Sequence, residues 1–393
     1  MEAHPTPPPS PQKPQPDQNP DPNPTAKQES TVEPGQITCP ADLVVVRSLG
    51  SGAWGRVVMA KIANSTSLVA VKVFHKKEFS LTGEMSQHEL NTEKRHLSRL
   101  PWSPFLAGAV TGVSDHTNLS LVLELMPHGS FHHLIDRFGP FTPTEACFYY
   151  CNLVCAIGFI HSHGLVSRDI KPANFLVGPD GYLVMTDLGI AERARAGGLW
   201  QDMGTIEYMA PELIQQGYTV GTTVDWWSSG VVLYEMLTQT MPFKGHSEQL
   251  VYHNILMLNY QWPENAGWGN GLKHIISRLF TYDPEDRLGY SGTSQVMEHP
   301  WLSHVDWTWM RDRVYEAPWV PGGTEPIGKW HSQAMPTSDS MGGMKVRHPP
   351  RHLRHDRRFP DREFIVNDQD SGLGLEDADG SPEPALSAVT DDP

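Results

Sequence analysis

Residues 167–176 read SRDIKPANFL, which is the most informative string in the sequence. It places a carboxylate (Asp169), an ammonium group (Lys171) and a side-chain amide (Asn174) close together. A second carboxylate, Asp187, follows 18 positions after the first. Carboxylate and amide oxygens are ligands that Mg²⁺ accepts, and a lysine neutralises negative charge on phosphate. Each acid taken alone reads as a solvated loop residue, but the ordered set predicts a site for a metal ion and a phosphate group.

A glycine-rich string, GSGAWG, occupies residues 50–55 and is followed by Val57. Glycines let backbone amides approach phosphate oxygens closely, and the aromatic Trp54 at the tip could cover the phosphates from water. A dinucleotide-binding fold uses a similar string but requires a helix after the glycines. Here residues 55–62, GRVVMAKI, read as a strand. The glycine loop is therefore predicted to join two antiparallel strands.

Lys72 ends the run VAVK on the next expected strand. A lone Lys on a strand is usually a surface residue, but Val71 and Val73 flank this one in a run too apolar for an outer edge. Its expected partner is an acid on the following helix. Glu89 and Glu93 are both available, because they lie one turn apart on one helix face.

From about residue 41, short β-branched runs are separated by Gly, Asn or Ser, which predicts antiparallel strands. A charged helical stretch follows at 84–100, and beyond residue 126 the pattern is mainly helical to about residue 304. We therefore predict an α+β fold of two lobes, a small antiparallel β lobe with one helix (41–126) and a larger, mainly helical lobe (127–304). Residues 305–328 contain Trp and Pro but little periodicity, and we expect an extended segment lying on the domain.

Both ends of the chain have the composition of disordered tails. Residues 1–40 are crowded with Pro, Gln, Asn and Asp and cannot bury enough apolar surface to offset the entropy of ordering. Residues 329–393 carry a basic stretch at 347–362 and then an acidic one at 368–392. Opposed charge blocks are typical of a solvated tail, and a docking or nuclear-import signal is the alternative.

The overall composition narrows the class of partner. A formal net charge of −15 argues against nucleic acid. The sequence has no charged-then-apolar signal segment and no apolar run long enough to span a bilayer, so we expect no membrane partner. We expect a soluble monomer in a reducing compartment, with the cytoplasm as the default and the nucleus left open by the basic stretch.

The chain has four cysteines, too few for a disulfide framework in 393 residues. Cys147, Cys151 and Cys155 have the spacing of one helix face and could form a metal site. Their neighbours are apolar, which favours the simpler interpretation that they are small core residues.

The stretch from about residue 43 to 304 resembles the protein kinase catalytic domain. Besides the strings above, MAPE at 209–212 looks like the end of an activation segment, and DWWSSG at 225–230 looks like the start of the buried large-lobe helix. Lys171 and Thr205 follow the Ser/Thr pattern rather than the Tyr pattern. By resemblance, Arg287 pairs with Glu212.

Longer strings resemble the AGC group, the relatives of the cyclic-nucleotide-dependent kinases and protein kinase C. They are VDWWSSGVVLYEML, LFTYDPEDRLG, EHPWLSHVDW and APWVP, and the last two belong to the large lobe and the start of an AGC-like C-terminal extension (305–328).

The resemblance implies transfer of the ATP γ-phosphoryl group to Ser/Thr hydroxyls of protein substrates. Asp169 would position the hydroxyl, Lys171 would neutralise charge, and Glu93 would pair with Lys72 to hold the phosphates. The implied magnesium ligands are Asn174 and Asp187. The implied ATP-binding residues are Gly50, Ser51, Gly52, Ala53, Trp54, Gly55, Val57, Ala70, Lys72, Leu123, Glu124, Met126 and Leu176.

The chain departs from the family pattern around the activation segment. Ser167 stands where kinases usually carry His or Tyr, and Leu188 replaces the usual Phe. No Ser, Thr or Tyr occurs between Leu188 and Gly204, and the position usually phosphorylated is Gln201. Asp202 could offer a permanent negative charge to Arg168 instead. These features predict a kinase that needs no activation-loop phosphorylation.

Other departures concern substrate choice and the tail. Ser130 and Ala173 stand where arginine-selecting kinases of this group carry acids, whereas Glu235 remains. A hydrophobic docking motif is missing, since Phe359 and Phe364 have the wrong spacing. The main rival to an active kinase is a pseudokinase scaffold, and a small-molecule or lipid kinase is a weaker one. The sequence indicates no particular regulatory partner.

Overall fold

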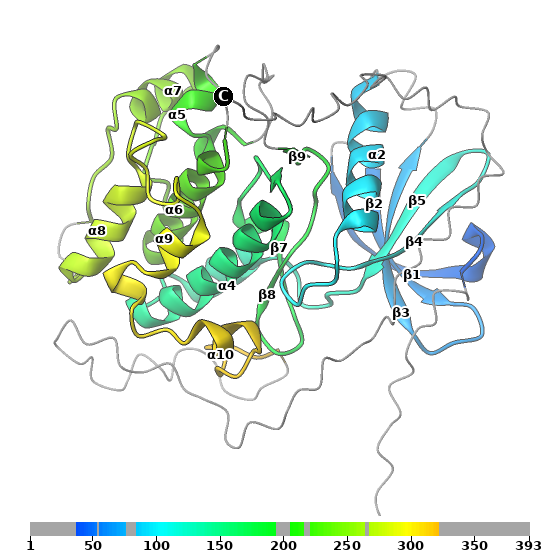
Figure 1. Cartoon of the computed structure of the whole chain (residues 1–393). Helices are drawn as coiled ribbons and strands as arrows, with labels where there is room; N and C mark the ends of the chain where they lie inside the picture. Colours follow the sequence, from blue (N-terminus) through cyan, green and yellow to red (C-terminus); the bar gives the residue numbers. More distant parts are fainter. Residues whose placement is uncertain are drawn as a thin grey trace, which may run out of the picture.

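A computed structural model describes residues 37–52, 55–75, 84–193, 205–215, 221–263 and 267–321 of the chain. Of the predicted tails (1–40 and 329–393), only residues 37–40 are described, and the predicted extension (305–328) is described up to residue 321. The described part forms a β lobe and a helical lobe side by side, which confirms the predicted α+β, two-lobed fold (Figure 1). None of the described helices is both long and apolar enough to cross a membrane.

The small lobe is built on an antiparallel sheet with the strand order β1-β2-β3-β5-β4. Its Val-rich strands are β1 (Leu43–Gly52), β2 (Gly55–Ile62), β3 (Leu68–His75), β4 (Ala109–Ser114) and β5 (Asn118–Glu124). Alternate side chains of β2 and β3 face inward, so that Val58, Ala60, Val69 and Val71 are buried. Ile37, just before the sheet, packs into the same small core.

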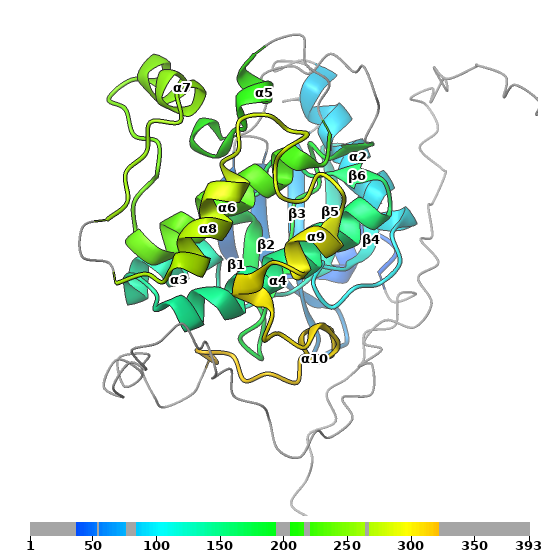
Figure 2. The same ribbon diagram turned by 60° about the vertical axis from the view of Figure 1, so that its left-hand side comes forward.

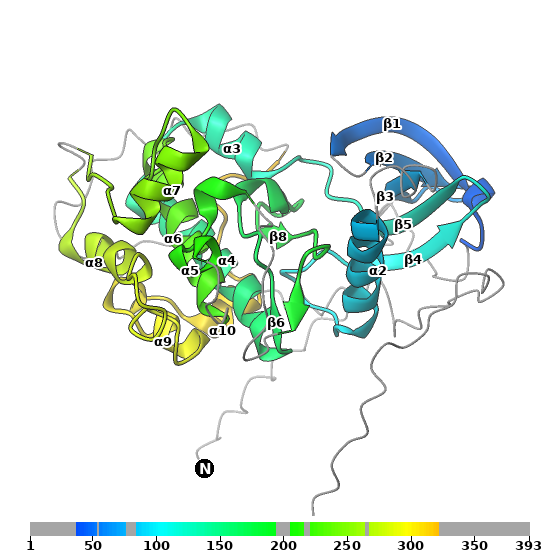
Figure 3. The same ribbon diagram turned by 90° about the horizontal axis from the view of Figure 1, so that it is seen from above.

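The register of the sheet places Lys72 beside the strand that follows the glycine string. Gly52 pairs with Gly55 at the β1–β2 hairpin, and Val57 of β2 lies opposite Lys72 of β3. The glycine string thus joins two antiparallel strands, as predicted. Helix α2 (Glu84–Arg99) lies along the sheet on the side that faces the large lobe (Figure 3).

The large lobe is organised around two buried helices, α4 and α6, which lie side by side with α8 and α9 outside them (Figure 2). Thr142 and Glu145 form a capping box at the start of α4, and Pro143 occupies its first turn. The helices of this lobe are α3 (Phe131–Phe138), α4 (Pro143–Ser162), α5 (Pro211–Ile214), α6 (Thr223–Thr238), α7 (Glu248–Leu256), α8 (Asn270–Leu279) and α9 (Thr293–Met297).

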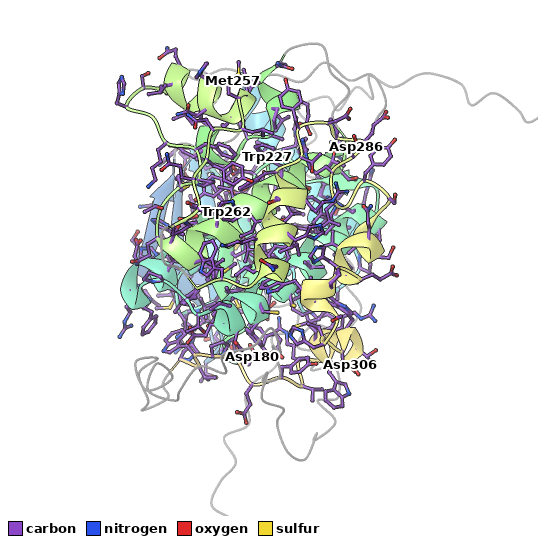
Figure 4. The ribbon with its side chains drawn as sticks, turned by 90° about the vertical axis from the view of Figure 1, so that its left-hand side faces the viewer. Asp180, Trp227, Met257, Trp262, Asp286 and Asp306 are labelled. Atoms are coloured by element: carbon purple, nitrogen blue, oxygen red, sulfur yellow. The ribbon has the colours of Figure 1, made fainter. Side chains whose placement is uncertain are left out.

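Aromatic side chains fill the core of the large lobe. The ring of Trp227 stacks on Phe243 with centroids 5.4 Å apart and contacts Phe280 at 5.2 Å, and Figure 4 shows Trp227 deep among the helices. The three cysteines of α4 are also buried here. Their burial agrees with the interpretation of these residues as core residues.

Two short antiparallel strand pairs flank the loop of residues 167–174. β6 (Leu165–Val166) pairs with β9 (Glu192–Arg193), and β7 (Phe175–Val177) pairs with β8 (Leu183–Met185). A 3-10 helix at Pro172–Asn174 ends the loop that begins after β6 and leads directly into β7. The loop 167–174 therefore has both of its ends fixed by strands.

The segment after residue 304 is less extended than predicted. It contains a short helix, α10 (Trp307–Arg311), because the Asp306 carboxylate caps it by accepting from Thr308 N and Trp309 N at 2.9 and 3.0 Å. A helix of five residues is too short to produce a visible sequence period. Its described residues after α10, up to residue 321, lie against the domain, where Tyr182 OH donates to Tyr315 O at 2.8 Å. Asp180 and Asp306 lie at the same edge of the lobe (Figure 4).

Candidate active site

Lys72 forms ion pairs with carboxylates from both lobes. Its Nζ lies 2.7 Å from Glu93 Oε2 on α2 and 3.2 Å from Asp187 Oδ1 of the large lobe. Glu93 is 1% exposed, so the small-lobe end of this contact is buried. Of the two acids that the sequence offered, Glu93 is the observed partner, whereas the side chain of Glu89 lies outside the described ones.

The two carboxylates raise the pKa of the Lys72 ammonium group. Burial alone would lower the pKa of Lys72, but the negative charges of Glu93 and Asp187 outweigh it and raise this pKa above its ordinary value. Burial likewise works against ionised Asp187, yet Lys72 and the Gly189 amide keep its pKa below the usual range. Both groups are therefore charged at neutral pH.

Asp225, near the start of α6, fixes the backbone at the start of the loop 167–174 through hydrogen bonds. Its two carboxylate oxygens accept from Ser167 N and Arg168 N, each at 2.8 Å, and Asp225 itself is fully buried. Arg168 has a left-handed backbone with φ of 65°. Non-glycine residues adopt this conformation rarely, and here the carboxylate of Asp225 stabilises it.

The remaining groups of the loop converge on Asp169. Asn174 donates from Nδ2 to Asp169 Oδ2 at 2.8 Å and to Asp169 O at 2.9 Å. Lys171 Nζ is 2.8 Å from Asp169 Oδ2 and also donates to Thr205 Oγ1 at 2.8 Å. The predicted catalytic Asp and Lys are thus adjacent, and Thr205 links them to the end of the activation segment.

The donor set around Asp187 fits a divalent cation. Asn174 uses its amide nitrogen toward Asp169, and Asp187 uses Oδ1 toward Lys72 and Gly189 N. Within the described residues, no hydrogen bond takes Asn174 Oδ1 or Asp187 Oδ2. The Thr186 amide donates to Asn174 O at 2.9 Å and keeps the two side chains close. A carboxylate and an amide oxygen are suitable magnesium ligands.

The glycine loop shows two different uses of glycine. A Cβ on Gly55 would lie 2.2 Å from Val73 O, so this glycine is required by packing within the sheet. A Cβ on Gly50 would meet nothing within 4 Å, so packing does not require this one. Open space above Gly50 is what a phosphate-binding backbone would need. Ala53 and Trp54 lie outside the described residues, and for Ser51 and Gly52 only the backbone is described.

The apolar residues that we expect around adenine come from both lobes. Ala70 and Leu123 are buried, and Val57 packs against the same core. Leu176 of β7 is half-buried. Glu124 and Met126 follow at the end of β5.

The predicted contact of the Glu124 backbone with adenine is limited to the Glu124 carbonyl. The Glu124 amide already donates to Gly108 O at 2.9 Å, so only the Glu124 carbonyl could face a nucleotide. The Met126 amide makes no hydrogen bond to other described residues.

Comparison with known proteins identifies the domain that carries this geometry. A family model described as the protein kinase domain matches residues 43–302. The chain belongs to the protein kinase family. The fold, the Lys72–Glu93 pair and the loop around Asp169 are those that the sequence resemblance implied.

The kinase domain is similar in sequence to curated members of the AGC group, the group that the sequence indicated. A cAMP-dependent protein kinase catalytic subunit of Arthrobotrys oligospora is 34% identical over 287 residues, which are 72% of this chain and 54% of that protein. The cAMP-dependent protein kinase catalytic subunit PRKX of Homo sapiens is 32% identical over 71% of this chain and 77% of that protein. Protein kinase C delta type of Mus musculus is 32% identical over 71% of this chain and 40% of that protein. The chain thus spans about half of the fungal relative's length.

A buried ion pair anchors the end of the activation segment in this kinase domain. Arg287 donates to both carboxylate oxygens of Glu212, at 2.5 and 2.9 Å, and the Arg287 side chain is fully buried. It also donates to Thr223 O and Thr281 O. This is the Glu212–Arg287 pairing that the kinase resemblance implied.

The start of the activation segment is held by polar contacts that the sequence reasoning missed. Arg168 Nε donates to Ile190 O at 2.8 Å, and His96 of α2 lies 3.1 Å from Ala191 O through its Nε2. Ser167 and Leu188, the two departures from the family pattern, are both buried. Residues 194–204, with Gln201 and Asp202, lie outside the described part of the kinase domain.

The acid positions linked to arginine selection differ in their surroundings. Ser130 precedes α3 and its Oγ lies 2.8 Å from His133 Nδ1, while Ala173 is exposed. Glu235 is buried and accepts from Tyr208 OH at 2.7 Å. Burial raises the pKa of the Glu235 carboxyl above its ordinary value.

Proposed function

We propose that this chain is a protein Ser/Thr kinase that transfers the γ-phosphoryl group of ATP with magnesium. The observation that carries the proposal is the contact of Lys72 with both Glu93 and Asp187, which joins the two lobes in the arrangement that phosphoryl transfer needs. Degenerate relatives acting as scaffolds would be expected to lack part of this set.

The chain's own residues provide positioning and charge. Lys72 would bind the α- and β-phosphates of ATP, and the backbone of the glycine loop would cover them. Asp187 and Asn174 would hold Mg²⁺, which neutralises phosphate charge when it is bound.

At the reacting end, Asp169 would accept a hydrogen bond from the substrate hydroxyl and orient it for in-line attack. Lys171, 2.8 Å from Asp169, would stabilise charge on the transferred group.

We further propose that activity does not require phosphorylation of the activation segment. Residues 189–203 contain no hydroxyl-bearing side chain. Arg168, which pairs with a loop phosphate in other kinases of this kind, here donates to the Ile190 carbonyl. Mass spectrometry of the active protein tests this proposal, because an activating phosphate between residues 188 and 204 would refute it.

We also propose a relaxed demand for arginine in the substrate. Ser130 and Ala173 provide no carboxylate, and Glu235 is buried against Tyr208 with a raised pKa. A guanidinium group binds best to an exposed, ionised carboxylate.

The proposed reaction has a direct chemical test. Full-length protein should add one phosphate to Ser or Thr peptides in the presence of ATP and Mg²⁺, and mass spectrometry with phosphoamino-acid analysis detects the product. Modification of Tyr alone, or of no peptide while lipids or small alcohols are phosphorylated, would replace the proposal with one of its rivals.

A further inference from the structure

His96 occupies an unusual position on helix α2. It lies one turn after Glu93, where the helix faces the protein interior, and it is only 7% exposed. Its Nε2 lies 3.1 Å from the carbonyl oxygen of Ala191. Because a carbonyl can only accept, Nε2 carries the proton of this hydrogen bond. A buried imidazole without such a partner would destabilise the fold, so the contact accounts for a polar residue at an apolar helix position.

The acceptor belongs to the first residues of the activation segment. Ala191 lies four positions after Asp187 and immediately before β9. The carbonyl of its neighbour Ile190 accepts from Arg168 of the catalytic loop at 2.8 Å. Two consecutive carbonyls are therefore held by donors from different lobes.

Helix α2 thus reaches the large lobe at two points on consecutive turns. Glu93 reaches Asp187 through Lys72, and His96 reaches Ala191 directly. Figures 1 and 3 show α2 on the side of the small lobe that faces β9. A movement of α2 away from the large lobe would have to break both connections. Each connection therefore favours the arrangement in which the other can form.

We propose that His96 is a positioning residue that ties α2 to the start of the activation segment and thereby holds Glu93 in contact with Lys72. The inference rests on the proposed kinase function for its effect on activity, but the tie itself is a property of the protein without substrate. It supplies, from within the fold, an ordering contact for a segment whose residues 189–203 cannot be phosphorylated on a hydroxyl.

Three variants separate the hydrogen bond from the packing. His96→Leu introduces an apolar side chain of similar size and removes the donor. His96→Gln places an amide donor near the position of Nε2 and should restore the contact. Arg95→Gln is the matched control, because Arg95 lies on the exposed face of the same helix.

Hydrogen exchange of the full-length protein without ATP is the first readout. Loss of a buried hydrogen bond typically changes a local equilibrium by about tenfold. We therefore expect amides of residues 188–193 to exchange about tenfold faster in His96→Leu, and near the parent rate in His96→Gln and Arg95→Gln. Unchanged exchange in His96→Leu, in a variant that unfolds at the parent temperature, would overturn the proposal.

Kinetics gives the second readout. We expect His96→Leu to lower kcat about tenfold and to change the KM for ATP much less, because the residues expected around adenine (Val57, Ala70 and Leu123) belong to strands of the sheet and not to α2. Recovery of kcat in His96→Gln distinguishes positioning from packing. If the parent transfers no phosphate, the proposed function fails while the exchange experiment still decides whether the tie exists. An equal loss of kcat in His96→Leu and His96→Gln, with normal exchange in the latter, would refute the positioning role.

Discussion

Lys72 and Glu93 form an ion pair of 2.7 Å across the face between the small-lobe sheet and helix α2. Asp187 approaches the same ammonium group from the opposite lobe at 3.2 Å. The side chains that we propose to hold triphosphate and metal therefore lie close together, and such an arrangement would reduce the reorganisation that substrate binding requires.

Removal of either end of the Lys72–Asp187 contact should abolish phosphoryl transfer. Lys72→Ala removes the charge that holds the phosphates, and Asp187→Ala removes a metal-binding carboxylate, so we expect at least about a hundredfold loss of rate for each. Circular dichroism and thermal unfolding should show that both variants fold. A variant with the parent rate would refute the assignment of that residue.

The buried pair between Glu212 and Arg287 should contribute strongly to stability. Glu212→Gln leaves the Arg287 charge buried without its carboxylate, and we expect a loss of about 3–5 kcal/mol in the free energy of unfolding. Denaturant unfolding of the two proteins measures this difference. Glu285→Gln serves as the control, because Glu285 is exposed. Equal losses in both variants would contradict a special role of the buried pair.

His299 should make the large lobe sensitive to acid. Burial, followed by the nearby His274 and Arg278, lowers the pKa of His299 to about 4. The unfolded chain therefore binds a proton at higher pH than the folded one, and stability is lost as pH falls from about 6.5 towards 4. Protonation would also turn His299 Nδ1, which accepts from Trp301 N, into a donor.

Comparison of melting temperatures between pH 7 and 4 tests the effect of His299. The parent should lose stability more steeply than His299→Gln, whose amide oxygen can accept from Trp301 N at every pH in this range. Parallel curves for the two proteins would show that His299 does not titrate as expected.

An acid at position 130 should restore selection for arginine. We expect Ser130→Glu to raise the preference for peptides with arginine before the target by about two- to fivefold, the size of an exposed ion pair. Ratios of kcat/KM for paired peptides with and without arginine measure the preference. Thr144→Glu adds the same charge at another exposed site and should leave the ratio unchanged. A parent protein that already requires arginine would contradict the relaxed selection.

The fold could be predicted where local patterns and motifs agree. Val-rich runs around Lys72 gave the strands, and the string around Asp169 identified the loop, because its residue types must keep fixed spacings to meet at one phosphate. Glu93 could be separated from Glu89 only by resemblance, since both lie on one helix face. Helix α10 escaped prediction because it depends on the single cap at Asp306.

The contact of His96 could not be predicted for a different reason. Nothing local in the sequence links α2 to Ala191, which lies 95 residues away. Only the packing of the two lobes brings the imidazole and the carbonyl together. A histidine at an apolar position of a helix was the sole available signal.

Transfer of radiolabelled phosphate from ATP to an arrayed library of Ser, Thr and Tyr peptides tests the central claim most directly. The full-length protein would first be treated with phosphatase and would be compared with Asp187→Ala. We predict label on Ser and Thr peptides with the parent and none with the variant. Absence of label from both, with ATP binding retained, would contradict the kinase assignment and favour a scaffold.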